Sequence, residues 1–232
     1  QGAMKRLTFS DKLPPVLLLL GISLFTPLTQ AHPHMWIDAN VQMIVNDQGQ
    51  LTGVRQTWTF DDMFSSYAIQ GVPLDARRQP RQSDLDVIAA DWIEALGDPM
   101  SHYFTDIEQS GQTIATLSAN NVGSLWNAAQ GRLTLTFDLP LQTSAQPRAG
   151  SISVRVADPT FFVAYEFDRE QLSQASRLPE GCTTEYIPAR QLDPVTASRL
   201  ASIPSSQTVP PPELLAITRT LQHRIELSCS PS

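Results

Sequence analysis

The stretch MWIDANVQMIVNDQGQLTGVRQTWTF, residues 35–60, contains the clearest pattern in this sequence. Its first half alternates strictly between apolar and polar residues, and a period of two predicts a strand with one buried face. The segment NDQGQ supplies a turn, so LTGVRQTWTF (residues 51–60) is predicted to pair back as the second strand of a hairpin. The apolar residues of the first strand are Met35, Ile37, Ala39, Val41, Met43 and Val45.

The segment SDLDVIAADWIEALGD (residues 83–98) changes to a helical period. Ser83 has a side chain that is typical of a helix N-cap, and the apolar residues after it are spaced for one helical face. We therefore predict a helix that Ser83 caps. The apolar residues of its expected buried face are Val87, Ile88, Trp92 and Leu96.

Further strands are predicted downstream of this helix. The segment HYFTDIEQSGQTIATLSA (residues 102–119) is expected to form a hairpin that turns at Ser110–Gly111. GRLTLTFDL (residues 131–139) alternates cleanly, and SISVRVADPTFFVAYEF (residues 151–167) predicts two strands separated by a break at Asp158–Pro159. The four apolar residues on one face of the alternating segment are Leu133, Leu135, Phe137 and Leu139.

The pattern weakens toward the C-terminus. LDPVTASRLAS (residues 192–202) is compatible with a short helix, and the Pro- and Ser-rich segment SIPSSQTVPPPE (residues 202–213) predicts a loop. PELLAITRTLQHRIELS (residues 212–228) fits either a helix or a strand. Together these segments predict a mainly β fold, an antiparallel β-sandwich-like domain with one or two inserted helices.

The N-terminus has the features of a secretory signal. Residues 1–3 are typical of a cloning scar, so Met4 is the expected natural start. Basic residues precede an apolar run, Leu13–Leu28. The segment TQA that follows ends in Ala31 and has small residues at the positions that a signal peptidase recognises. We predict cleavage after Ala31, which leaves residues 32–232 as a single periplasmic domain. The alternative is a retained anchor, but the run is broken by prolines and shorter than the roughly 20 residues that a membrane span needs.

Charge argues against nucleic acid as a partner. The whole chain has a formal net charge of -7, and residues 32–232 contain no lysine at all. Their positive charge comes from arginines alone, which the acidic residues outnumber. Nucleic-acid-binding proteins carry a basic surface, so we expect no such partner.

Two cysteines, Cys182 and Cys229, lie near the C-terminus. In an exported protein an even pair predicts a disulfide. Closing that loop stabilises the fold by roughly 4 kcal/mol in the chain-entropy model. A thiolate metal site is the alternative, but such sites have closely spaced cysteines, which this chain lacks.

The start of the expected mature chain, HPHMWID, carries the strongest chemical signal. On a strand His32, His34, Trp36 and Asp38 share one face, opposite the apolar stripe. Imidazole and carboxylate are ligands that zinc takes. Asp38 lies roughly 13 Å from His34 by strand rise, so it can act with a neighbouring strand or orient a ligand, and another segment must complete the site. The alternative is that these histidines are polar residues at a frayed terminus and bind no metal.

A mature N-terminal histidine offers a second possibility, copper. Its amine and imidazole can bind one copper ion as a histidine brace. The other terminal copper chelate needs deprotonated amides at the second and third residues, and Pro33 has no N–H to lose.

The remaining candidates are weaker. Asp61 and Asp62 follow a predicted strand, where they could face the same site or cap a helix over DMFSSYAIQ. His102 and His223 are more typical of structural histidines, although His102 stays a possible additional ligand. No Gly-rich phosphate loop, His-Glu-x-x-His helix or Gly-x-Ser-x-Gly elbow is present, so we do not predict an enzyme.

A secretory signal followed at once by His-Pro-His-x-Trp-Ile-Asp resembles a family of bacterial periplasmic proteins, formally of unknown function, that includes the ZevA-like zinc-binding proteins. The likeness extends to WTFDDMFS (residues 58–65) and ADPTFFVAYEF (residues 157–167). Members of this family occur beside permeases of the nickel/cobalt type. The resemblance implies an accessory role in transition-metal uptake, with His32, His34 and Asp38 on the opening motif. The chain lacks a long histidine-rich tract, which favours a single site or handover point over buffering of several ions.

The expectation is therefore a periplasmic protein that binds Zn²⁺ and delivers it to an inner-membrane permease, in contact with the membrane surface. Nickel, cobalt and copper stay open as alternative ions, because ligand preferences overlap among them. Two other functions also stay open. One is a copper-dependent oxidase built on a histidine brace, and the other is a structural subunit of the permease without a metal ligand at its terminus.

Overall fold

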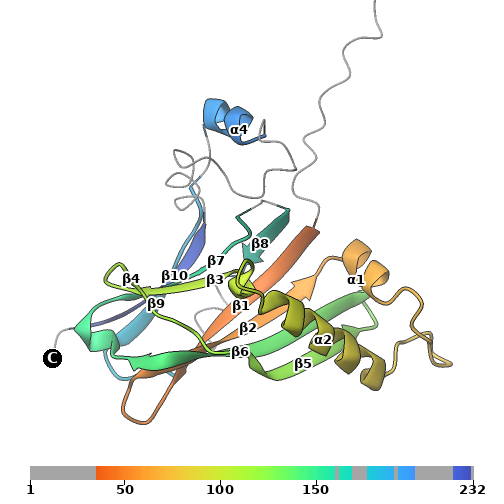
Figure 1. Ribbon diagram of the computed structural model, residues 1–232, viewed down its shortest axis with the longest axis horizontal. Helices are drawn as coiled ribbons and strands as arrows, with labels where there is room; N and C mark the ends of the chain where they lie inside the picture. Colours follow the sequence, from red (N-terminus) through yellow and green to blue (C-terminus); the bar gives the residue numbers. More distant parts are fainter. Residues whose placement is uncertain (1–34, 160–161, 169–176, 191–192, 202–221, 231–232) are drawn as a thin grey trace, which may run out of the picture. The chain divides into compact units, whose positions relative to one another are not determined.

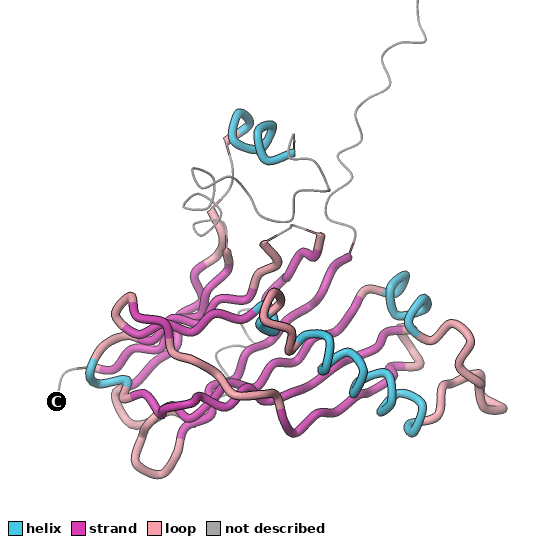
Figure 2. The backbone as a smooth tube through the Cα atoms, viewed as in Figure 1, coloured by secondary structure: helices cyan, strands magenta, loops and turns pink. Residues whose placement is uncertain are grey.

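The computed structural model describes residues 35–159, 162–168, 177–190, 193–201 and 222–230 (Figure 1). Strand is the commonest secondary structure in the described chain (Figure 2). The strands are β1 (Met35–Val45), β2 (Leu51–Phe60), β3 (Thr105–Gln109), β4 (Gln112–Thr113), β5 (Asn120–Asn127), β6 (Arg132–Ala145), β7 (Ile152–Val156), β8 (Val163–Phe167), β9 (Cys182–Ile187) and β10 (His223–Cys229). The helices are α1 (Asp62–Ala68), α2 (Gln82–Leu96) and α4 (Pro194–Ala201), with short 3-10 turns at His102–Phe104 and Pro147–Ala149.

The strands form two five-stranded sheets. The first sheet has the order β5-β6-β2-β1-β8 and the second has the order β4-β3-β7-β10-β9. All pairs are antiparallel except β1 with β8, which run parallel. A buried hydrogen bond joins the sheets, from Gln56 Nε2 to Thr105 Oγ1 at 3.0 Å. The predicted mainly β, sandwich-like class is confirmed.

The predicted hairpin over residues 35–60 is confirmed with its register. Ile37 pairs with Phe60 and Val41 with Gln56. Alternation placed the apolar residues of β1 on the buried face, where Ile37, Ala39, Val41 and Met43 are no more than 5% exposed. The polar residues between them lie on the opposite, outer face.

The core of the first sheet is centred on β2 and β6. Trp58 packs edge-to-face on Phe137, with ring centroids 5.1 Å apart, and against Tyr165 at 5.4 Å. The predicted apolar face of residues 131–139 is confirmed, because each of its four members is at most 1% exposed. These residues are Leu133, Leu135, Phe137 and Leu139.

Two strands, β5 and β9, were not predicted from the sequence. No residue of either strand is fully buried, so neither shows the alternation that marked β1 and β6. Strand β5 forms because β6 offers its free edge, with Trp126 opposite Leu133. Strand β9 forms along β10 in the same way.

The helix over residues 83–98 is present, but two details of its prediction were wrong. Helix α2 begins at Gln82, its N-cap is Arg81, and no side chain caps it, so Ser83 lies inside the first turn. Val87 is 61% exposed, whereas Leu85 and Ala89 are each 2% exposed. The stripe that meets the first sheet runs through Leu85, Ala89 and Trp92, whose ring lies 5.0 Å from that of Phe60, and Val87 lies outside this stripe.

The predicted hairpin at Ser110–Gly111 is confirmed. Both residues have positive φ, 51° and 79°, as a two-residue turn between right-twisted strands requires. Glycine accepts this conformation without steric cost, which explains its place at the second position. The turn connects β3 and β4, and β3 pairs with β7.

The C-terminal segments are confirmed where they are described. Helix α4 forms within residues 192–202, and the strand alternative holds for the last part of residues 212–228, which lies in β10. The predicted loop, residues 202–213, and the predicted signal, residues 4–31, lie outside the described residues. Among the described residues, no helix is long and apolar enough to cross a membrane.

The predicted disulfide is confirmed. Cys182 and Cys229 lie directly opposite each other on β9 and β10, with Cα atoms 3.9 Å apart, and are bonded. The bond ties the last described strand to the edge of the second sheet. Its two cysteines are 47 residues apart in sequence.

We predict that replacing both Cys182 and Cys229 with alanine lowers the free energy of unfolding by roughly 4 kcal/mol, because the crosslink restricts the unfolded chain. Denaturant unfolding of the oxidised protein and the double variant measures the difference. As a control, neither cysteine should react with a thiol reagent before reduction. Equal stability of the two proteins would contradict the prediction.

A cluster of three rings joins the two sheets near the start of β10. The ring of His223 stacks on Tyr186 and lies 5.5 Å from Phe167 of β8. Its Nδ1 is 2.6 Å from the Tyr186 hydroxyl. Burial lowers the pKa of His223, because the imidazolium loses solvation in this cluster.

We predict that His223 makes the fold less stable in acid. Its pKa is lower folded than unfolded, so the unfolded chain takes up the proton first, and stability falls as pH drops through the ordinary value of roughly 6.5 toward the lowered one. Thermal unfolding of metal-free protein between about pH 8 and about pH 5 should show this loss in the native protein and less of it in His223→Gln. His102→Gln, which changes an exposed histidine, is the control. The prediction is wrong if the unfolding temperatures of His223→Gln and of native protein change equally with pH.

Candidate functional site

Of the predicted site residues, Asp38 and Asp61 lie near the end of the first sheet where β1 begins. His32 and His34 lie outside the described residues, which start at Met35. Figure 1 shows α1 and the start of β8 beside the start of β1. Trp36 is 42% exposed on the outer face, and the Asp38 side chain is 55% exposed there.

Asp38 is paired with an arginine. Its Oδ2 accepts a hydrogen bond from Arg132 Nη1 at 2.6 Å. The same guanidinium donates to the carbonyl oxygens of Phe60, at 2.6 Å, and Thr59, at 3.1 Å. Arg132 is therefore held in place by the end of β2. Any cation that binds Asp38 has to compete with a fixed positive charge.

A second carboxylate, Glu166, lies next to Asp38. The parallel pairing of β1 with β8 places the two residues directly opposite each other. Partners in a ladder project from the same face, and neighbouring strands are about 4.8 Å apart. Both side chains are exposed. Sequence reasoning missed Glu166, because no local pattern shows that a strand more than a hundred residues away pairs with β1.

Asp61 connects β2, α1 and the start of β1. Its Oδ1 accepts the backbone N–H of Phe64 at 2.7 Å, which makes it the N-cap of α1. Its Oδ2 accepts the backbone N–H of Trp36 at 2.9 Å. Asp61 therefore caps α1, as the helix-cap alternative predicts. A ligand role for Asp61 stays a prediction, and any ion there would meet two oxygens that already accept hydrogen bonds.

The other weak candidates do not join this group. Asp62 is exposed in the first turn of α1 and its Oδ1 accepts the N–H of Met63. His102 and His223 precede and begin strands of the second sheet, whereas Asp38 lies in the first. Within the described ranges, no three His, Cys, Asp or Glu side chains are placed to hold one ion.

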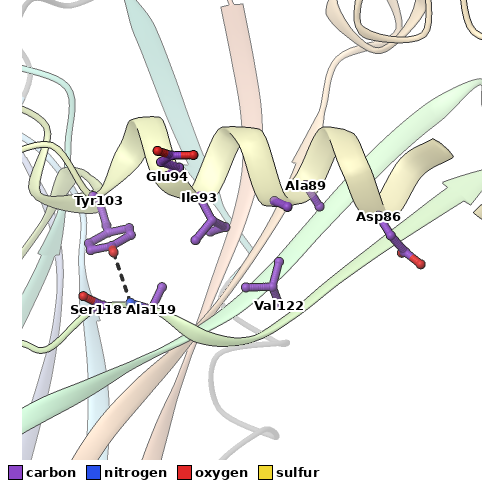
Figure 3. Close-up of a pocket in the computed structure, with 10 residues that line it drawn as sticks. Asp86, Ala89, Ile93, Glu94, Tyr103, Ser118, Ala119 and Val122 are labelled. Carbon is purple, nitrogen blue, oxygen red and sulfur yellow. Dashed lines mark hydrogen bonds between the residues drawn. The ribbon is translucent and has the colours of Figure 1, made fainter. Parts of the chain in front are cut away.

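A separate groove of about 510 Å³ lies between α2 and residues 118–122 (Figure 3). Its lining is mainly small and apolar, with Ala89, Ile93 and Val122 facing one another in Figure 3. Asp86 at one end accepts hydrogen bonds from Gln82 Nε2 and Ser124 Oγ. Of the predicted ligands that the structure describes, none lines this groove.

The turn beside this groove has a strained backbone. His102, Tyr103 and Phe104 all have left-handed φ, between 46° and 53°, which costs about 1–2 kcal/mol per non-glycine residue. Tyr103 holds the turn through its hydroxyl oxygen, which accepts the N–H of Ala119 at 3.0 Å. Gly97 permits this arrangement, because a Cβ there would come within 2.7 Å of the tyrosine hydroxyl.

Comparison with known proteins identifies the family. The model of the family described as "Protein of unknown function (DUF1007)" matches residues 16–229, so the chain belongs to this family. An uncharacterized protein of Haemophilus influenzae is 27% identical over 171 residues, which cover 73% of this chain and 79% of that protein. Membership of a family of unknown function is thus confirmed, and zinc binding stays a prediction.

If Asp38 contributes to zinc binding, Arg132→Met should raise the zinc affinity by up to about fivefold. The substitution removes the ion pair that competes for Asp38, and an exposed ion pair contributes roughly 0–1 kcal/mol. Arg55→Met is the matched control. Arg55 donates to Asp138 at 2.6 Å on the same face but at a distance from the start of β1. Calorimetric zinc titration gives the affinities, with thermal unfolding to confirm the fold. Weaker binding by a folded Arg132→Met protein would count against Asp38.

Proposed function

We propose that this member of the DUF1007 family is a periplasmic accessory protein that binds a transition-metal ion, zinc first, and passes it to an inner-membrane permease. His32 and His34 supply imidazole ligands and Asp38 contributes from the same face of the chain. The proposal assigns no catalytic step to the protein.

One observation carries the proposal. The strand into which His32 and His34 lead has an exposed, acidic outer face, where Asp38 and Glu166 lie opposite each other. Arg132 is paired with Asp38, and among the residues that the structure describes no ion pair is seen at Glu166. A face with this excess of carboxylate attracts divalent cations, and imidazole ligands next to it select transition metals.

The proposed periplasmic location rests on the sequence. Residues 4–31 have the charge, apolar run and small-residue exit of a secretory signal, which supports a periplasmic location. If the signal is retained, the same segment anchors the protein at the inner membrane. The permease partner and the contact with the membrane surface rest on the resemblance of the opening motif.

We predict that replacing both His32 and His34 with alanine abolishes stoichiometric Zn²⁺ binding and leaves the unfolding temperature unchanged. Both residues precede the strand and, by its period, lie on the polar side, so their loss opens no cavity in the core. Imidazole binds metal in its neutral form, so the affinity of the native protein should also fall as pH drops through roughly 6.5. Calorimetric titration of both proteins measures these effects.

Unchanged zinc affinity in the folded double variant would place the site elsewhere and contradict the proposal. Titration with Cu⁺ and Cu²⁺, together with mass spectrometry of the N-terminus, separates the copper alternative. A chain that starts at His32 and prefers copper would favour a histidine brace. A chain that starts at Met4 removes that alternative, and no binding of any ion by native protein would favour a structural subunit.

A further inference from the structure

We propose that the groove between α2 and residues 118–122 is a docking site for a short extended segment of a partner protein, in which one apolar side chain lies between two basic ones. The inference goes beyond the proposed function, because it uses none of the predicted metal ligands. It follows from the lining of the groove, the charge around it and the sheet edge beside it (Figure 3).

The groove stays open because the side chains that line it are mostly small. One face of α2 forms one wall, with lining residues that recur every three or four positions. These residues are Asp86, Ala89, Ala90, Ile93 and Glu94. The opposite wall has Ser118 and Ala119, so neither side fills the space between them.

The end of the groove at Tyr103 is fixed by the fold. The Tyr103 side chain is buried, and its hydroxyl oxygen accepts the N–H of Ala119 from the opposite wall at 3.0 Å. The left-handed turn that carries Tyr103 is strained, and such strain persists only where the surrounding structure holds it. The groove is therefore formed before a ligand arrives, which lowers the cost of binding.

The charged side chains that line the groove are both acidic. Helix α2 carries four acidic residues and no basic one. Arg81 pairs with Asp84, which does not line the groove. Residues 110–131, which include the facing wall, contain no charged residue. The groove therefore favours a ligand with positive charge and disfavours an acidic one.

Both lining acids are available to a ligand. Asp86 Oδ1 accepts hydrogen bonds from Gln82 Nε2 at 2.7 Å and Ser124 Oγ at 3.0 Å, which hold the carboxylate in place and leave Oδ2 for another donor. Glu94 is exposed, and within the described chain no ion pair is seen at its side chain. Figure 3 shows the two acids toward opposite ends of the groove, with apolar side chains between them.

The spacing of these acids fits an extended chain. Asp86 and Glu94 are eight residues apart on α2, which corresponds to about 12 Å along the helix axis. Four residues of extended chain span about 13 Å, and alternate side chains point the same way. Basic residues at positions i and i+4 of the ligand therefore reach both acids, and the residue at i+2 faces the apolar middle of the groove.

Strand β5 offers this segment a sheet edge beside the groove. It is the last strand of the first sheet, so no described strand pairs with its side away from β6. Val122 of this strand lines the groove and is 40% exposed, which leaves apolar surface for a ligand to cover. Extended peptides bind at such edges, with alternate side chains in pockets that give specificity.

Three synthetic peptides test the pattern. The first is Ser-Arg-Ser-Leu-Ser-Arg-Ser, the second has glutamate in place of both arginines, and the third has serine in place of leucine. We expect the first peptide to shift the NMR amide signals of Ala119 and Val122 in native protein. The glutamate peptide should not bind, and the peptide without leucine should bind about tenfold or more weakly, because it lacks the apolar side chain that the groove buries.

Substitutions on α2 locate the binding site. Ala90→Trp fills the groove from an exposed helix position and should abolish binding, whereas Ala95→Trp, outside the lining, should not. Glu94→Gln should weaken binding of the arginine peptide about two- to fivefold. Asp91→Asn removes the same charge from α2 outside the lining and should leave the affinity unchanged. Should Ala90→Trp not fold, Glu94→Arg is the second variant and should weaken binding more than Glu94→Gln.

Three results would each overturn the inference: equal binding of the arginine and glutamate peptides, undiminished binding by folded Ala90→Trp or Glu94→Arg, and no binding by native protein. A native dimer that Ala90→Trp dissociates in sedimentation experiments would also overturn it, because the groove would then hold a second copy of the chain. None of these results concerns the proposed metal site, which zinc titration tests separately.

Discussion

Burial of the inner face of the first sheet is the constraint on which the rest of the structure depends. Trp58 and Phe137 lie edge-to-face at its centre and are at most 2% exposed. Each fully buried apolar side chain of this size contributes about 1.5–3 kcal/mol or more. One layer of cover does not reach across the whole face. The turn before β3 covers Phe137 through Tyr103, whose ring lies 5.9 Å away, and α2 covers the part around Phe60 through Trp92.

Two buried polar side chains inside this core, Gln56 and Ser65, are hydrogen-bonded, and their bonds join elements that are distant in sequence. The Gln56 side chain is 0% exposed, accepts the indole N–H of Trp58 at 3.2 Å and donates to Thr105 in the second sheet. Ser65 of α1 is equally buried and accepts the N–H of Leu133 at the start of β6. Leaving either group unpaired would cost roughly 1–3 kcal/mol, so these bonds also restrict how the layers can pack.

This packing leaves the outer face of the first sheet for charged and polar residues. Asp38, Glu166 and Arg132 can gather there because none of them is needed in the core. The end of the sheet at which β1 begins is also where β2 gives way to α1, and Asp61 serves both.

The sequence by itself determined the elements whose pattern is local. Strict alternation predicted β1 and β6 with the correct buried faces, and the turn after β1 predicted that β2 pairs back on it. Turn residues predicted the hairpin at Ser110–Gly111, and cysteine count with an export signal predicted the disulfide. It also predicts metal chemistry for the opening motif, since that prediction uses only residue type and spacing. Only the tertiary structure decided that Glu166 lies opposite Asp38, that β5 and β9 are strands, and that Leu85 rather than Val87 is buried on α2. The reason is physical. Periodicity records which side of a segment meets the core, whereas the partner of a strand or a carboxylate is set by contacts between residues far apart in the chain.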